Sequence, residues 1–171
     1  MLCAESKVFY NLAQITFLPL KQSDFALEAR NSAYMNEEAN KRIVREIYNR
    51  FENGDYRGLL DLCSPEIDWT VPEVENSPYT GPWHGTKSVR EYFRLMSETE
   101  EITDFEPREF VAQGEKVIVT GRLTSTVRMT GRHFSTEWVH IFTVRNGKIK
   151  SFHEFYDTAA ALRAFQMATF A

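Results

Sequence analysis

Cysteine is scarce in this chain. Its 171 residues include only Cys3 and Cys63, which are too few for a disulfide framework or for a zinc site built from cysteines. The histidines His84, His140 and His153 lack the spacing of metal ligands, so the sequence predicts no metal site. This cysteine usage favours a reducing compartment, and we expect a cytoplasmic location.

An excess of basic residues is also missing. The formal net charge is −4 and the pI is about 5.6, which argues against a nucleic-acid partner or an anionic membrane surface. No apolar run approaches the length of a membrane span. The sequence has no glycine-rich phosphate loop, P-loop or nucleophile elbow. We therefore expect no nucleic acid, no membrane and no cofactor as partners.

Aromatic residues are abundant by contrast. They make up 13% of the chain, which is enough for both a core and an apolar cavity. Many lie in residues 134–157, where two alternating runs flank Asn146-Gly147. That dipeptide is typical of the tight turn of a β-hairpin, because both of its positions need a positive φ. The segment is predicted to be a two-stranded hairpin.

Both faces of this hairpin carry apolar groups, so we expect it to be covered on both sides. In the second arm, alternation places Glu154 on the same face as Phe152 and Tyr156. Burying a carboxylate among aromatic rings costs folding free energy, so such a group usually has a hydrogen-bonding or charged partner or a functional role. Glu154 is thus the leading candidate for a functional residue. In the first arm, His140 lies on the same face as Trp138. A buried histidine of this kind is more often a core residue than a catalytic one.

The rest of the chain predicts an α+β fold. Helical periodicity, capping residues and turn signals indicate helices over 36–51, 55–63 and 86–96, a strand over 67–71, strands over 101–112 and 116–128, and a short helix over 158–165. Asn36, Asp55 and Thr86 are the predicted caps of the first three helices. A long loop over 72–85 carries Tyr79, Trp83 and His84. It is predicted to be a lid or a binding loop, or else a segment whose aromatic side chains pack against the edge of the core.

Residues 1–34 are predicted to be an extension outside the fold, and residues 35–171 to form one domain. The alternative for the extension is a short amphipathic arm that packs on the domain or on a partner. It does not have the basic start and continuous apolar stretch of a secretory signal.

Four segments together carry a resemblance to a known family. They read IVREIYNRFENGDYRGLLDLCSPEIDWTVP, YTGPWHGTKSVREYF, EFVAQGEKVIVTGR and WVHIFTVRNGKIKSFHEFYDTAA. In this order they resemble the SnoaL-like branch of the NTF2-like superfamily, which also includes the ketosteroid isomerases and limonene epoxide hydrolase. The resemblance implies a cone-shaped barrel, in which a curved, mostly antiparallel sheet wraps around three N-terminal helices. It also implies a homodimer formed through the sheet.

The catalytic residues of these relatives match only in part. The resemblance places Val71 at the position of the isomerase base. A small shift of the alignment would place Glu73 there instead. The Arg-x-Asp of the epoxide hydrolase matches Arg122-Leu123-Thr124, so its water-activating acid is a threonine in this chain. The last-strand acid of the SnoaL-type polyketide cyclases matches Glu154, with Asp157 as the second choice. The fold hosts many activities, so the resemblance does not fix one.

The resulting hypothesis is a pocket protein for small hydrophobic molecules. It would be a cofactor-free acid/base enzyme of isomerase, cyclase or hydrolase type, acting on a carbonyl or cyclic substrate. Glu154 would transfer the proton, and Arg122 or His140 would stabilise the developing oxyanion. Each residue also has a structural alternative. Glu154 could instead form an ion pair that fixes the register of the strands. Arg122 could instead lie on the side of the sheet that faces the dimer partner. The candidate cavity-lining residues are Trp69, Tyr79, Trp83, Trp138, Phe152 and Tyr156.

Two other functions remain open. A non-catalytic ligand-binding or dimerisation module would retain a ligand without changing it, and the incomplete match to the catalytic pairs of both relatives favours it. A protein-transport adaptor would need a partner groove, which nothing in the sequence marks.

Overall fold

The computed structural model describes residues 22–167, which form four helices and one six-stranded sheet. In chain order the elements are α1 (Gln22–Glu52), α2 (Tyr56–Asp61), β1 (Cys63–Val71), β2 (Gly81–His84), α3 (Gly85–Thr99), β3 (Glu100–Gln113), β4 (Lys116–Val127), β5 (His133–Arg145), β6 (Lys148–Tyr156) and α4 (Thr158–Phe165). No helix in this part of the chain is both long enough and apolar enough to cross a membrane.

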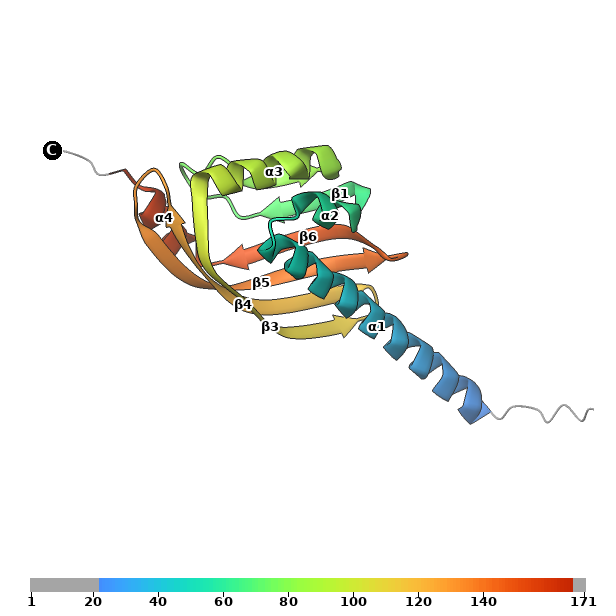
Figure 1. Ribbon diagram of the computed structural model, residues 1–171. Helices are drawn as coiled ribbons and strands as arrows, with labels where there is room; N and C mark the ends of the chain where they lie inside the picture. Colours follow the sequence, from blue (N-terminus) through green and yellow to red (C-terminus); the bar gives the residue numbers. More distant parts are fainter. Residues whose placement is uncertain (1–21, 168–171) are drawn as a thin grey trace, which may run out of the picture.

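The sheet is curved and its strands follow the order β2-β1-β6-β5-β4-β3. Neighbouring strands are antiparallel except for β1 and β6, which are parallel. Figure 1 shows α1, α2 and α3 on one side of this sheet and α4 at its end. The predicted α+β class and the cone-shaped arrangement of a curved sheet around three helices are therefore confirmed.

The hairpin that joins β5 and β6 forms as its turn chemistry predicts. Asn146 and Gly147 have φ angles of 53° and 72°, the left-handed region that the turn needs. The register pairs Trp138 with Tyr156 and His140 with Glu154. Each pair shares one face of the sheet, and that face lies toward the helices. The alternation predicted for both arms is thus confirmed.

Helix α1 begins earlier than its predicted cap at Asn36. It starts at Gln22, because the sequence between Gln22 and Glu52 contains neither glycine nor proline to end a helix. Contacts with the sheet begin at Glu37, whose Oε1 accepts a hydrogen bond from the Gly114 backbone N–H at 2.8 Å. Residues 30–36 are exposed. The predicted boundary at residue 35 therefore falls inside α1, and residues 1–21 lie outside the described residues.

Other boundaries also differ from the prediction, and β1 begins at Cys63 rather than at residue 67. The loop over 72–85 contains strand β2, which pairs with β1 and sets Trp83 opposite Trp69. Helix α3 is preceded by His84 rather than capped by Thr86, and no side chain caps it. By contrast, Asp55 caps α2 as predicted, and Asp157 caps α4.

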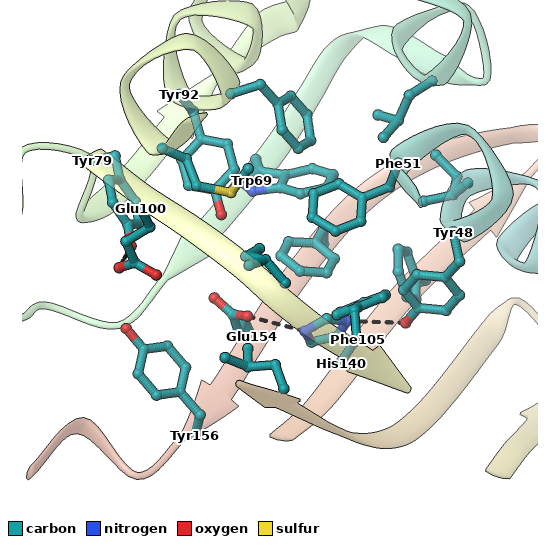
Figure 2. Close-up of a pocket in the computed structure, with 18 of the residues that line it drawn as sticks. Tyr48, Phe51, Trp69, Tyr79, Tyr92, Glu100, Phe105, His140, Glu154 and Tyr156 are labelled. Carbon is teal, nitrogen blue, oxygen red and sulfur yellow. Dashed lines mark hydrogen bonds and ion pairs between the residues drawn. The ribbon is translucent and has the colours of Figure 1, made fainter. Parts of the chain in front are cut away.

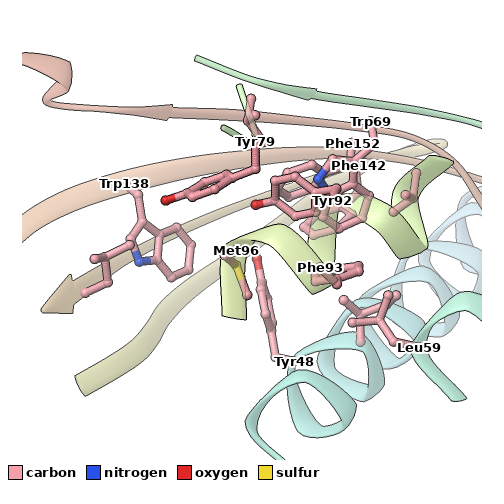
Figure 3. Packing of buried hydrophobic residues seen from close by; sticks show 14 of the residues in the cluster. Tyr48, Leu59, Trp69, Tyr79, Tyr92, Phe93, Met96, Trp138, Phe142 and Phe152 are labelled. Carbon is pink, nitrogen blue, oxygen red and sulfur yellow. The ribbon is translucent and has the colours of Figure 1, made fainter. Parts of the chain in front are cut away.

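The core lies between the concave face of the sheet and the helices, and it is rich in aromatic rings (Figure 3). Trp138 is nearly fully buried, and its ring stacks on Phe105 and His140. Directly across from it on β4 is Gly121. A Cβ atom at that position would overlap the indole ring, so glycine is needed here for space.

Candidate functional site

A cavity of about 70 Å³ lies inside the cone, between the sheet and helices α1 and α3. A water molecule takes about 30 Å³, so the cavity holds only a few atoms as it stands. Most of its wall is aromatic or aliphatic, and the polar groups come from a small set of side chains (Figure 2). The wall includes Tyr48, Trp69, Tyr79, Tyr92, Glu100, His140, Phe152, Glu154 and Tyr156.

One polar cluster joins three elements around His140. Its Nε2 lies 3.0 Å from Oε1 of Glu154 on β6, and its Nδ1 lies 2.9 Å from the hydroxyl of Tyr48 on α1. The side chain of Glu154 is 13% exposed and that of His140 is 5% exposed. The cluster is therefore shielded from solvent, and Figure 2 shows His140 between Glu154 and Tyr48.

The partners of His140 set the direction of the hydrogen bond to Glu154. Burial, with the nearby Glu154 carboxylate, raises the pKa of Tyr48 well above its usual value, so its hydroxyl stays protonated. The Glu154 carboxylate can only accept, so Nε2 of His140 carries a hydrogen, and the Tyr48 hydroxyl is the partner of Nδ1. The Nε2–H group donates to Glu154. The carboxylate is thus held in place by one oxygen, and its other oxygen remains available to a ligand.

A second cluster surrounds Glu100, at the junction of α3 and β3. Glu100 is only 6% exposed. The Tyr79 hydroxyl donates a hydrogen bond to its Oε1, and Ser125 Oγ donates to its Oε2 at 2.5 Å. Sequence reasoning missed this residue, because it lies among the exposed acids Glu98 and Glu101. A usable signal is its alternation with Ile102, which also lines the cavity.

Burial makes the stability of the fold depend on pH through Glu100. Desolvation raises the pKa of its carboxyl, the hydrogen bonds from Ser125 and Tyr79 lower it in part, and the Glu154 charge raises it further. Its contribution to stability is complete below the unfolded-state pKa and is lost as the pH rises through the higher folded-state pKa. We expect Glu100→Gln to remove this loss. Urea unfolding of both proteins from about pH 4 to 8 tests this, and equal pH dependence would contradict it.

The predicted site residues fall into two groups. The structure brings Glu154, His140, Trp69, Tyr79, Phe152 and Tyr156 together around the cavity. Trp138 lies behind this wall, with its ring centroid 3.9 Å from that of His140. Trp83 does not line the cavity; it packs edge-on against Tyr92, with 6.1 Å between centroids.

Arg122 does not reach the cavity. Its neighbours Gly121 and Leu123 face inward, and strand alternation therefore turns Arg122 to the opposite face of the sheet. There it is exposed and pairs in register with Glu137. The predicted role of Arg122 in stabilising an oxyanion inside the cavity is corrected by this placement.

The described residues form no group of three or more histidine, cysteine, aspartate or glutamate side chains that could hold a metal ion. Cys63 is buried, and burial raises the pKa of its thiol to about 12. A thiol with this pKa stays protonated at neutral pH and is a poor nucleophile.

Comparisons with known proteins agree on one family. Residues 44–152 match the family described as a SnoaL-like domain. Among solved structures, an NTF2-like protein from Burkholderia xenovorans LB400 is 37% identical; the match covers 76% of this chain and 98% of that one, with a TM-score of 0.70. An NTF2-like protein from Burkholderia pseudomallei K96243 is 29% identical, over 75% of this chain and 98% of that one, with a TM-score of 0.69.

A third similar structure was determined with a small organic molecule. TerC, co-crystallized with polyporic acid, is 25% identical, over 75% of this chain and 99% of that one, with a TM-score of 0.66. A search of curated proteins finds no match.

Proposed function

The chain belongs to the SnoaL-like domain family of NTF2-like proteins, and from this we propose that it binds a small hydrophobic carbonyl or cyclic compound and transforms it by acid/base chemistry without a cofactor. The reaction class is proton transfer at a carbon next to a carbonyl. Glu154 is the base that removes the proton. The fold supports small-molecule binding, and TerC, a structural relative, was crystallised with polyporic acid.

One observation carries this proposal: the Glu154 carboxylate is fixed inside an aromatic cavity by the His140 N–H. A general base must be oriented and must keep its proton-accepting oxygen free, and this arrangement supplies both. The hydroxyl of Tyr156, on the same strand, also lines the cavity. Burial raises the pKa of Tyr156 well above its usual range, so it stays protonated and can donate a hydrogen bond to a substrate oxygen.

The size of the cavity sets a condition on the substrate. About 70 Å³ is less than half of the roughly 150 Å³ in which an engineered protein cavity binds benzene. A cyclic substrate therefore enters only when side chains of the wall move. Tyr79 is the natural candidate, because it lies in the connection between β1 and β2 rather than within a regular element.

Deuterium exchange tests the proposed reaction without knowledge of the natural substrate. The protein is incubated in D₂O with cyclopentanone, cyclohexanone and 1-indanone, and loss of the protons next to the carbonyl is followed by NMR. Cyclohexene oxide, with product analysis, covers the hydrolase alternative. We expect exchange above the buffer rate with at least one ketone. Exchange at the buffer rate with every ketone, together with an unchanged epoxide, would contradict an acid/base enzyme of this class.

The second candidate is a non-catalytic binding module, which the incomplete match to the catalytic residues of the epoxide hydrolase favours. Thr124 stands where that enzyme has an acid, and Arg122 faces away from the cavity. This candidate predicts that a ketone from the panel binds and is recovered unchanged. Ligand-observed NMR with product analysis distinguishes the two, because binding without exchange supports only the module.

The outer face of the sheet supports a homodimer formed through the sheet. Apolar side chains lie next to each other there: Ile118 pairs with Val111 and Ile141, and Val139 pairs with Phe155, which is 46% exposed. Contiguous apolar surface of this kind marks an interface.

Charge on this face is expected to separate the dimer. We predict that Val139→Glu combined with Phe155→Glu gives a monomer, while Met129→Glu, at an exposed methionine in the β4–β5 turn, keeps the dimer. Light scattering coupled to size-exclusion chromatography gives the masses. A wild-type monomer at micromolar concentration would contradict the dimer.

A further inference from the structure

The cavity contains a second carboxyl group, Glu100, whose surroundings differ from those of Glu154. Glu154 is on β6 and pairs with an imidazole, whereas Glu100 is on β3 and its carboxyl group accepts hydrogen bonds from two hydroxyl groups. Both side chains line the same cavity, as does Tyr156, which is drawn below them in Figure 2. Two acids in one site acquire different roles when their environments differ.

Glu100 has no cation to balance a negative charge. Among the described residues it forms no ion pair, while its neighbours Glu98 and Glu101 pair with Arg94 and Arg128 outside the cavity. The titratable groups that face it are the hydroxyls of Tyr79, Tyr92 and Tyr156 and the carboxylate of Glu154. A buried carboxylate without a cation is costly, and a second negative charge nearby makes it more so. Of the two acids, Glu100 is therefore the one whose surroundings favour the neutral form.

We propose that Glu100 is the proton donor of this site, a neutral carboxylic acid that protonates the substrate oxygen while Glu154 removes a proton from carbon. This inference rests on the proposed function and adds a second catalytic residue to it. The substrate is then a carbonyl compound with a hydrogen on the adjacent carbon. Its apolar body lies against the aromatic wall, and its oxygen reaches toward Glu100.

Ser125 is arranged to serve both protonation states of Glu100. Its Oγ lies 2.5 Å from the carboxyl of Glu100 and 3.4 Å from the backbone carbonyl of Glu101. When Glu100 is neutral, its proton is on Oε1, the oxygen that the substrate reaches, and Ser125 can donate to Oε2 or to the carbonyl of Glu101. When Glu100 is ionised, the Ser125 hydroxyl turns to the carboxylate. Together with Tyr79, it stabilises the charge that proton donation leaves behind.

The proton transfers balance without any further reactant. The O–H bond of Glu100 breaks as the proton moves to the substrate oxygen, and the electron pair stays on the carboxylate. The C–H bond next to the carbonyl breaks as its proton moves to Glu154, and its electron pair forms the C=C bond of an enol. In the return step, Glu154 gives its proton to a carbon of the enol and the substrate oxygen returns its proton to Glu100. Return to a different carbon isomerises the substrate.

Access to Glu100 requires that Tyr79 give up its hydrogen bond, because the hydroxyl of Tyr79 occupies Oε1. The substrate oxygen takes over this position. The same movement enlarges the cavity, so binding at Glu100 and admission of a cyclic substrate are a single event.

Infrared spectroscopy tests whether Glu100 is a neutral acid in the free protein. The carbonyl stretch of a protonated carboxylic acid is recorded in D₂O at neutral pH for the full chain and for Glu100→Gln, Glu154→Gln and Glu101→Gln. We expect a band that disappears only in Glu100→Gln. In Ser125→Ala the band should persist to higher pH, because the conjugate base loses a donor. A wild-type protein without the band, or a band that survives Glu100→Gln, would overturn the proposal.

Ketone exchange with 1-indanone and cyclohexanone in D₂O then tests the catalytic role. Glu100→Gln is expected to lower the exchange rate by about 10²-fold, whereas Glu101→Gln, at the exposed adjacent acid, leaves it unchanged. Exchange that falls in Glu154→Gln but not in Glu100→Gln would overturn the role of Glu100 and leave the proposed function intact. Wild-type exchange at the buffer rate would instead contradict the proposed function, and with it catalysis by Glu100.

Discussion

Replacing Glu154 with glutamine is expected to slow ketone exchange by about 10²–10⁴-fold, the usual contribution of a general base. The change keeps the size and shape of the side chain, and the amide oxygen can still accept the hydrogen bond from His140. What is lost is the ability to take a proton. The fold should therefore survive, and the loss should be confined to turnover.

The matched control for this experiment is Glu137→Gln. Glu137 is also a strand glutamate, but it is highly exposed on the outer face of the sheet. Exchange rates of both variants are compared by NMR at equal protein concentration, with circular dichroism to check the fold. A Glu154→Gln protein that retains the wild-type rate would remove Glu154 from the base role, and the cavity would then be at most a binding site.

The second large effect is expected on stability, at Trp138 and Gly121. Trp138→Ala removes a buried indole that stacks on Phe105 and His140, and a loss of about 3–5 kcal/mol in the free energy of unfolding is expected. Gly121→Ala places a methyl group where the indole ring lies. Overpacking of this kind costs about 1–3 kcal/mol.

The two changes should not be additive, because they act on the same space. Once Trp138 is alanine, the methyl group at position 121 has room, so the cost of Gly121→Ala should largely disappear in the double variant. Thr120→Ala, at the adjacent outward-facing position, is the control. Urea unfolding of the four proteins of the cycle gives the coupling energy. Additive losses would show that Gly121 is not required for the packing of Trp138.

The hairpin could be predicted in detail because its signals are local. The turn at Asn146-Gly147 fixes the register, and alternation fixes which side chains share a face. From these alone, Glu154 was expected to lie on the same face as Phe152 and Tyr156. The resemblance to the SnoaL-like family supplied the remaining arrangement of helices and strands.

Features that depend on distant segments could not be predicted in this way. Strand β2 exists because it pairs with β1, and its four residues carry no clear strand pattern of their own. Glu100 becomes a buried acid only because Tyr79 and Ser125, from two other parts of the chain, meet it inside the cone. Arg122 was ambiguous in the sequence, since either face of β4 could have been the inner one for a polar side chain.

A crystal structure of the protein with 1-indanone tests the central claim most directly, namely that the inside of the cone is a ligand site served by the last-strand acid. The account predicts density for the ketone among Trp69, Phe152 and Tyr156, with the carbon next to its carbonyl facing a carboxylate oxygen of Glu154. Density only on the outer face of the sheet, or an unchanged cavity with Glu154 turned to bulk water, would contradict it.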